Sequence, residues 1–292
     1  MELLPLAELE KMAPVFRGRA GNALAGFLLK LLRIKDVERE YNSLAHLKGA
    51  ELARGVLERA GMSYTVNGLP REEAMAALGA ELPEGPFITI SNHPMGHLDG
   101  MALIDFFGHL RGDYKYMVND ILGRFESLGP SLITVNPTGA VRTAPTARSI
   151  SGIRLAAENL QSGHALGLFP SGAVSDLKLG RRPVVEVDNT IAYREPRVRD
   201  REWQMAIVKF IAKAGVPVLP VRILDGNSRF YYGLGLLDWR VRLLRLPAEM
   251  FNKNGKTMRI VTGPLITPSR IASCASLPEL RTLLRASVYS LE

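Results

Sequence analysis

The residues of this sequence that are best suited to chemistry lie in one short segment, residues 91–100, which reads SNHPMGHLDG. It contains His93 and, after five intervening residues, Asp99. An imidazole can take the proton of a hydroxyl, and a carboxylate beside it fixes the tautomer and stabilises the imidazolium that forms. The pair therefore suits general-base catalysis in which a hydroxyl of the substrate is the nucleophile, although a His and an Asp at this spacing, taken alone, are more often structural.

Three further segments combine apolar runs with turn residues: LITVNP at 132–137, LFPSGAVS at 168–175 and GVPVLPV at 215–221. The Pro and Gly of the second favour a tight turn whose backbone N–H groups can face an oxyanion or phosphate. Taken singly, each segment is typical of an ordinary turn or buried strand. A serine hydrolase of acyl esters is disfavoured, because no Gly-x-Ser-x-Gly elbow surrounds Ser171.

These segments need elements to position them. Short apolar runs predict strands, with helical stretches between them; the strands are expected at 87–90, 114–118, 132–135, 165–169 and 216–223, and the helices at about 95–110, 145–160 and 203–214. The helix after His93 is expected to open at Pro94, a favourable first-turn residue. Strands alternating with helices predict an α/β fold with a largely parallel sheet flanked by helices.

The first seventy residues are expected to be helical. An apolar stretch at 21–33 ends in basic residues, and Asp36 is placed to cap a long helix that ends near Gly61. No Pro/Gly/Ser-rich linker divides the chain, so residues 1–70 and 71–292 are expected to form one compact unit with a helical front end. A helix with an apolar middle and a basic end suits the interface of an anionic membrane.

Composition limits the class of protein. The 292 residues are 47% hydrophobic and 23% charged, which is ordinary for a globular chain and excludes a disordered one. The single cysteine, Cys274, excludes an internal disulfide and a cysteine-rich metal site, and it fits a reducing compartment. No uninterrupted apolar run reaches the roughly 18 residues of a spanning helix, and the amino terminus does not resemble a secretory signal.

The net charge of +8 is uneven along the chain. Residues 177–259 contain 17 Lys and Arg against 8 Asp and Glu, a local charge of +9. A region this basic favours an anionic partner such as a nucleic acid, a phosphate-bearing carrier or an acidic membrane, although a merely solvated basic surface is an equal alternative. Nucleic acid is disfavoured, because the basic residues are not interleaved with stacking aromatics and no nucleic-acid-binding module is recognisable.

The order of the four segments resembles the glycerolipid acyltransferase superfamily, the lysophosphatidate-acyltransferase-like enzymes. The resemblance covers roughly residues 85–225. It is closest to the bacterial lysophospholipid or ornithine/glycine-lipid O-acyltransferase branch, which carries Asn-His-Pro-x-Gly-x-x-Asp-Gly and a downstream segment like GNSRFY at 226–231. It implies a mixed sheet flanked by helices, an amino-terminal helical hairpin, and an acyltransferase domain over 71–292.

The resemblance also implies roles for individual residues. His93 would be the general base and Asp99 its orienting acid. The substrate-binding residues would be Asn92, Gly96, Asn136, Phe169, Pro170, Ser171, Gly172, Val218 and Pro220, with no metal and no cofactor. The acceptor hydroxyl would attack the thioester of acyl-carrier protein or coenzyme A directly, at the cytoplasmic face of the bacterial inner membrane, with the enzyme attached peripherally.

The sequence departs from the family pattern at positions that carry charge. Where the family has Glu and Arg in its third motif, this chain has Ser171 and Val174, and Asn136 stands where the second motif ends in Arg. Because a buried phosphate without an Arg partner is poorly compensated, the acceptor is expected to be a lyso-lipid or an N-acyl amino-acid lipid rather than lysophosphatidate. Arg142 and the run 194–201 are the alternative sources of a cation.

A second departure concerns spacing. The superfamily usually places four residues between the His and the Asp, whereas this chain has five. The extra residue turns Asp99 by about 100° on a helix, so the pair meets only if the first turn is looped, with Gly96 the best candidate for the loop. His97 is expected on the helix surface. Lysophosphatidate or glycerol-3-phosphate acyl transfer, or a non-catalytic basic membrane-binding protein, are the alternative functions.

Overall fold

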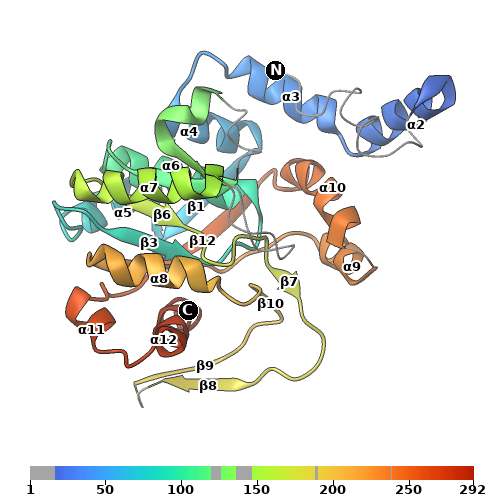
Figure 1. Ribbon diagram of the computed structural model, residues 1–292. Coiled ribbons are helices and arrows are strands. Elements are labelled where there is room, and N and C mark those ends of the chain that lie inside the picture. Colours follow the sequence, from blue (N-terminus) through green and yellow to red (C-terminus); the bar gives the residue numbers. More distant parts are fainter. Residues whose placement is uncertain (1–16, 120–125, 136–146, 188–189, 238) are drawn as a thin grey trace.

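The structure is a computed structural model that describes residues 17–119, 126–135, 147–187, 190–237 and 239–292. One eight-stranded sheet crosses this part of the chain in the order β2-β1-β12-β11-β3-β6-β4-β5 (Figure 1). Its strands are β1 (Met62–Val66), β2 (Leu69–Pro70), β3 (Ile88–Ser91), β4 (Lys115–Asn119), β5 (Leu132–Val135), β6 (Leu166–Leu168), β11 (Val218–Ile223) and β12 (Lys256–Thr262). The five strands from β11 to β5 are parallel, and β12 is antiparallel to β11. The predicted α/β fold with a mixed, largely parallel sheet is confirmed.

Helices cover both faces of the sheet. One face packs against α4 (Gly49–Arg59), α5 (Arg71–Gly79) and α6 (His97–Leu110), and the other against α7 (Ala147–Gln161), α8 (Met205–Ala214) and α12 (Leu277–Tyr289). Side chains of a strand alternate between these two cores, as the two-residue period of a strand requires. In β11, Leu219 and Val221 face the α4–α6 core, whereas Val218 faces the α8–α12 core.

Seven strands of the described residues occur where none was predicted, and the two longest, β1 and β12, belong to the large sheet. β1 lies inside the stretch expected to be helical, and it pairs with β12, which was also missed. Both lie toward one end of the sheet and alternate polar with apolar residues, so neither has the continuous apolar run that marks the central strands. The remaining strands form two short pairs outside the large sheet: β7 (Asp176–Leu177) with β10 (Val198–Arg199), and β8 (Val184–Val187) with β9 (Ile191–Arg194).

The single long helix predicted after Asp36 is two helices, α3 (Ile34–Ser43) and α4. The chain breaks between them, and Gly49 adopts a left-handed φ of 54° at the start of α4. The apolar periodicity continues through the break because Leu44 and Leu47 of the loop pack against Gly55 of α4. The sequence pattern therefore could not reveal the interruption.

The amino-terminal helices are α2 (Gly18–Leu31) and α3, which contact each other across a turn at Arg33. The Arg33 guanidinium stacks 3.6 Å above the ring of Phe251 and so fixes this turn to the carboxyl-terminal half of the fold. That half contains α9 (Arg229–Leu237), α10 (Trp239–Glu249), η4 (Met250–Asn252) and α11 (Pro268–Ala272), and a further turn, η3 (Glu126–Ser131), precedes β5. Among the described helices, none is long and apolar enough to cross a bilayer.

Candidate active site

The candidate catalytic residues lie where β3 ends, beside the end of β11. These two strands are parallel neighbours, and the loops that follow such strands are where α/β sheets place their sites. Asn92 joins the two ends: its Nδ2 donates to the carbonyl of Ile223 and its Oδ1 accepts from the N–H of the same residue, both at 2.8 Å. Both sides of the Asn92 amide are thus engaged by the backbone, and the loop that begins at His93 is held in place.

The structure brings His93 and Asp99 together. Nδ1 of His93 lies 3.1 Å from Oδ2 of Asp99, although the two atoms are not aligned as a hydrogen bond. Such contacts commonly tighten when substrate binds. The Asp99 side chain is fully buried and that of His93 is 16% exposed, so the imidazole is the member of the pair that an incoming substrate can reach.

A looped first turn makes this contact possible despite the five intervening residues. The helix begins at His97 rather than at the predicted Pro94, because Gly96 adopts φ 76°, a conformation that side chains rarely adopt. Asp99 therefore lies in the first turn of α6, from which its Oδ2 accepts the N–H groups of Met95 and Gly96 at 2.8 and 3.0 Å. The expected bulge at Gly96 is confirmed.

The electrostatics of Asp99 reflect two opposing effects. Burial raises the pKa of its carboxyl, while His93 and the N–H groups of Met95 and Gly96 lower it. The amino-terminal end of α6 also favours negative charge at this position. The carboxylate is therefore held in a dry but hydrogen-bonded site, as a group that orients an imidazole requires.

Phe169 packs directly on the candidate base. Its ring stacks on the His93 imidazole with the centroids 3.8 Å apart and the planes inclined by 25°. It follows β6, the other parallel neighbour of β3, and begins the predicted turn, in which the N–H of Gly172 donates to the Phe169 carbonyl at 2.9 Å. Gly172 has φ 63°, so the turn requires the glycine.

Gln204, which precedes α8, fixes this turn from the other side. Its N–H donates to the carbonyl of Pro170 at 2.9 Å, and its Nε2 donates to that of Ser171 at 3.3 Å. The Ser171 hydroxyl donates to the Ala173 carbonyl at 2.8 Å, and the side chain is buried. The structure thus brings Phe169, Pro170, Ser171 and Gly172 together in one turn beside His93, with Ser171 engaged within its own turn.

A second buried carboxylate, Asp200, holds the main chain of His93. Its Oδ1 accepts the N–H of His93 at 3.2 Å and the hydroxyl of Ser175 at 2.5 Å, while the N–H of Ser175 donates to the His93 carbonyl at 2.8 Å. Trp203 Nε1 donates to the other carboxylate oxygen at 3.0 Å, and the Tyr289 hydroxyl accepts the Asp200 N–H at 2.8 Å. Sequence reasoning missed this group, because an Asp at the end of an Arg-rich run gives no local signal.

Residues 9–292 match the sequence profile of a protein family described as "Acyltransferase". The chain belongs to this acyltransferase family. The resemblance to acyltransferases in the order of the four segments is thereby confirmed.

Two relatives of this chain are lyso-glycine lipid O-acyltransferases. The protein of Bacteroides thetaiotaomicron is 29% identical over 188 residues, and that of Phocaeicola vulgatus is 27% identical over 190 residues. Each match covers 62% of this chain, which spans 60% of the length of either relative. A crystal structure of the 1-acyl-sn-glycerophosphate (LPA) acyltransferase PlsC from Thermotoga maritima matches 89% of the chain and 83% of its own, with 15% identity and a TM-score of 0.45.

Three of the predicted site residues lie away from His93 or outside the described residues. Val218 pairs with Ile88 at the opposite end of the two strands, and its side chain is part of the α8–α12 core. Pro220 lies in the middle of β11, where its carbonyl accepts the N–H of Gly263 at 2.9 Å. Asn136 and the alternative cation Arg142 fall outside the described residues.

The expectation for His97 is wrong. It is the first residue of α6, yet its Nε2 is inaccessible to solvent and has no hydrogen-bond partner among the residues that the structure describes. Burial, together with the nearby His93 and Lys253, lowers the pKa of His97 to about 4. The imidazole is therefore neutral at pH 7, and its ring lies within electrostatic reach of the candidate base.

This shift predicts a pH dependence of stability. Below an ordinary pKa of 6.5, the unfolded chain takes up a proton at His97 that the folded protein does not, so the free energy of unfolding falls as the pH falls from 6.5 toward 4. At pH 5 this amounts to about 2 kcal/mol. We expect urea unfolding at pH 7 and pH 5 to show a smaller loss of stability for His97→Gln than for the unaltered protein. Equal losses would contradict a neutral buried His97.

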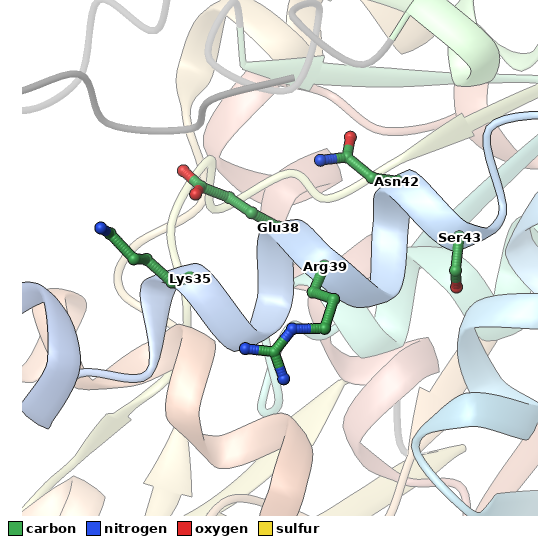
Figure 2. A pocket seen from close by; sticks show the side chains of 5 residues that line it. All are labelled: Lys35, Glu38, Arg39, Asn42 and Ser43. Carbon is green, nitrogen blue, oxygen red and sulfur yellow. The ribbon is translucent and has the colours of Figure 1, made fainter.

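Neither of two hollows in the described structure coincides with the His93 site. Figure 2 shows the larger, an open hollow of about 650 Å³ along α3, where Lys35, Glu38 and Asn42 point to one side of the helix and Arg39 to the other. The smaller, about 260 Å³, lies between the ends of β11 and β12 and is lined by residues that include Leu219 and Gly263. The candidate site is therefore defined by its contacts rather than by these hollows.

Proposed function

We propose that the protein transfers a fatty acyl group from an acyl thioester, carried by acyl-carrier protein or coenzyme A, to the hydroxyl of a lyso-lipid or N-acyl amino-acid lipid. The observation that carries the proposal is the 3.1 Å contact between His93 Nδ1 and the buried Asp99 carboxylate, at the end of a central parallel strand. Membership of an acyltransferase family supports the reaction class. The lyso-glycine lipid O-acyltransferases among its relatives support the class of acceptor.

In the proposed reaction, Asp99 holds Nδ1 of His93 protonated and leaves Nε2 free to act as the base. Nε2 takes the proton of the acceptor hydroxyl while the hydroxyl oxygen attacks the carbonyl carbon of the thioester. The new carbon–oxygen bond forms, the carbon–sulfur bond breaks, and the leaving thiolate receives the proton from the imidazolium. Phe169 keeps one face of the imidazole dry, and the Ser175–Asp200 pair keeps the His93 backbone fixed.

The surroundings of Val174 support an acceptor without a phosphate. Val174 is buried, and the guanidinium of Arg242 from α10 donates to its carbonyl at 3.2 Å, so a cation does stand near the position where the family has Arg. Arg242 Nη2 lies 2.8 Å from Asp176 Oδ1, a carboxylate that Arg201 and Lys178 share, and the Arg242 side chain is only 2% exposed. Its guanidinium is therefore kept from a dianionic headgroup by burial and by its bonds to the surrounding backbone rather than by charge balance.

We therefore expect a preference for an N-acyl amino acid with a free hydroxyl, or for a neutral or zwitterionic lyso-lipid, over lysophosphatidate. The expected ratio of kcat/KM values is at least about tenfold, or roughly 1.4 kcal/mol. Competition between an N-(3-hydroxyacyl)glycine and lysophosphatidate for one acyl thioester, with the products identified by mass, measures the ratio. Equal or better use of lysophosphatidate would overturn the acceptor assignment and leave acyl transfer standing, whereas no product from either would overturn the proposed reaction.

We propose that the protein attaches peripherally to the cytoplasmic face of an anionic membrane and acts there. Large apolar side chains are exposed on α2, where Phe27 is 63% and Leu24 is 41% exposed. Lys30 adds a cation to the last turn of this helix. α9 and α10 expose a second group of apolar side chains, which consists of Phe230, Leu236, Leu237 and Leu243. α10 lies beside α3 (Figure 1). Exposed apolar residues flanked by cations suit an anionic bilayer interface.

We expect Phe27→Glu to weaken sedimentation with acidic phospholipid vesicles at least several-fold, because it places a carboxylate where an apolar ring enters the interface. High salt should release part of the unaltered protein. Leu179→Glu is the matched control, since Leu179 is 68% exposed but lies outside both apolar groups. Equal sedimentation of the Phe27 variant and the unaltered protein would contradict attachment through α2.

A further inference from the structure

The segment 226–232, GNSRFYY, lies against the catalytic loop but has no part in the reaction proposed above. It follows β11 just as the catalytic loop follows β3, and both loops meet at the carbonyl of Pro94. That carbonyl accepts the Tyr232 hydroxyl at 2.7 Å and Asn227 Nδ2 at 3.4 Å. The segment therefore lies directly beside the loop that carries His93.

A buried lysine lies against this segment. Lys253 is 3% exposed, and its Nζ donates to the carbonyl of Gly226 at 2.8 Å. Within the ranges of the chain that the structure describes, no carboxylate lies within ion-pair distance of its Nζ. Burial lowers the pKa of Lys253, and the carboxylates of Glu249, Asp99 and Asp225 act on it from further away and raise it. An ammonium has three donors, so the bond to Gly226 leaves donors of Lys253 available for an anion, which would also favour its charged form.

Two polar atoms beside Lys253 are also without partners in the described structure. Because Nδ2 of Asn227 donates to Pro94, its Oδ1 remains as a buried acceptor with no hydrogen-bond donor. His97 Nε2 is likewise buried and has no hydrogen-bond partner among the described residues. Lys253 contacts Gly226, the neighbouring Asn227 contacts Pro94, and Pro94 follows His93, so these contacts place the lysine, the amide and the candidate base within one neighbourhood. His93 and Lys253 both act electrostatically on His97.

We propose that Lys253 and Asn227 bind the polar head of the acceptor, which is an N-acyl amino acid. The Lys253 ammonium takes the single carboxylate, and Asn227 Oδ1 accepts the amide N–H, while the acceptor hydroxyl faces His93. A monoanion matches one ammonium, and buried polar atoms left without partners are the usual basis of strong discrimination against analogues that lack the matching group. This inference rests on the proposed acyl transfer and names the acceptor that the same site selects.

The test compares N-(3-hydroxyacyl)glycine with its methyl ester, which keeps the hydroxyl and the amide but lacks the charge. We expect the unaltered protein to favour the acid by at least about tenfold in kcat/KM, and Lys253→Met to reduce that ratio at least about tenfold. Lys256→Met is the control, because it removes the same charge from an exposed position close by and should preserve the ratio. An unchanged ratio in Lys253→Met would overturn the assignment.

A second comparison concerns the amide. The N-methylated acceptor has no N–H, so the unaltered protein should use it poorly, and Asn227→Ala should lose this discrimination by at least about fivefold. In the comparison of acid and methyl ester, Lys253→Gln replaces Lys253→Met if thermal unfolding shows that Lys253→Met does not fold. Discrimination retained in Asn227→Ala would overturn the role of Oδ1.

Equilibrium binding separates this inference from the proposed function. The His93→Ala protein should bind the acid more tightly than the methyl ester in a calorimetric titration, and the added Lys253→Met change should abolish the difference. If the unaltered protein turns over neither acceptor but binding shows this dependence on Lys253, the acyl transfer is wrong and the site for an acylated amino acid stands. Equal binding of acid and ester would overturn the site, whatever the turnover.

Discussion

His93→Ala should abolish acyl transfer. The imidazole is the group that can take the proton of the attacking hydroxyl, and removing a general base lowers the rate by about 10²–10⁴-fold, and by more where several groups act as a unit. The ring lies at the surface of a preformed loop whose main chain is fixed by Ser175 and Asp200, so the fold should survive the change. Initial rates with an acyl thioester and an accepted lyso-lipid measure the effect, and thermal unfolding verifies the fold.

His46→Ala is the control for this experiment, because His46 is exposed on the turn between α3 and α4 and should leave the rate unaltered. His97→Ala should act mainly on the KM for the acceptor, since Nε2 of His97 lies in the neighbourhood of the proposed headgroup site. If His97→Ala abolished transfer and His93→Ala did not, the assignment of the base would be reversed.

Asp99→Asn should lower kcat on the order of 10³-fold. The amide keeps the size of the carboxylate, but the N–H groups of Met95 and Gly96 already donate to Oδ2, so the amide must turn its oxygen toward them. The uncharged amide no longer stabilises the imidazolium of His93. The KM values for donor and acceptor should change little, because the side chain is fully buried.

Asp36→Asn serves as the control for the loss of charge, since Asp36 pairs with Arg33 at the surface of α3. The decisive measurement is kcat at saturating donor and acceptor concentrations. A value for Asp99→Asn within about threefold of the unaltered protein would show that the carboxylate only holds the loop, which the amide oxygen can still do through Met95 and Gly96.

The central part of the fold could be predicted because burial leaves a continuous apolar run. β3, β6 and β11 lie inside the sheet with both faces covered, and all three were expected within two residues of their observed bounds. β1 and β12 were missed because each alternates polar with apolar residues, which is a weaker signal over so few positions. The break before α4 was missed because its loop leucines continue the helical pattern.

The residues of the candidate site also divide into those that the local sequence reveals and those that only distant contacts reveal. His93 and Asp99 could be found from type and spacing, and the condition under which they meet, a loop at Gly96, could be stated from the helical repeat alone. Asp200 could not be found from the sequence, since its function depends on a contact with His93, which lies 107 positions earlier. Lys253 was hidden for a similar reason, as one of the many cations of a basic region until burial distinguished it.

The hydrogen bond between Asp200 and the main chain of His93 also determines when, during synthesis, the catalytic loop can adopt its folded conformation. Asp200 must reach back 107 residues to the His93 N–H, and its own N–H bonds to Tyr289, which lies 89 residues further along the chain. At a synthesis rate of about 5–20 residues per second, roughly 10–40 s separate the appearance of the imidazole from that of the residue that completes its support. Contacts closed over such distances are also slow to form in a refolding chain. A ribosome-bound chain that already carries His93 and Asp99 should therefore not yet hold them as a working pair.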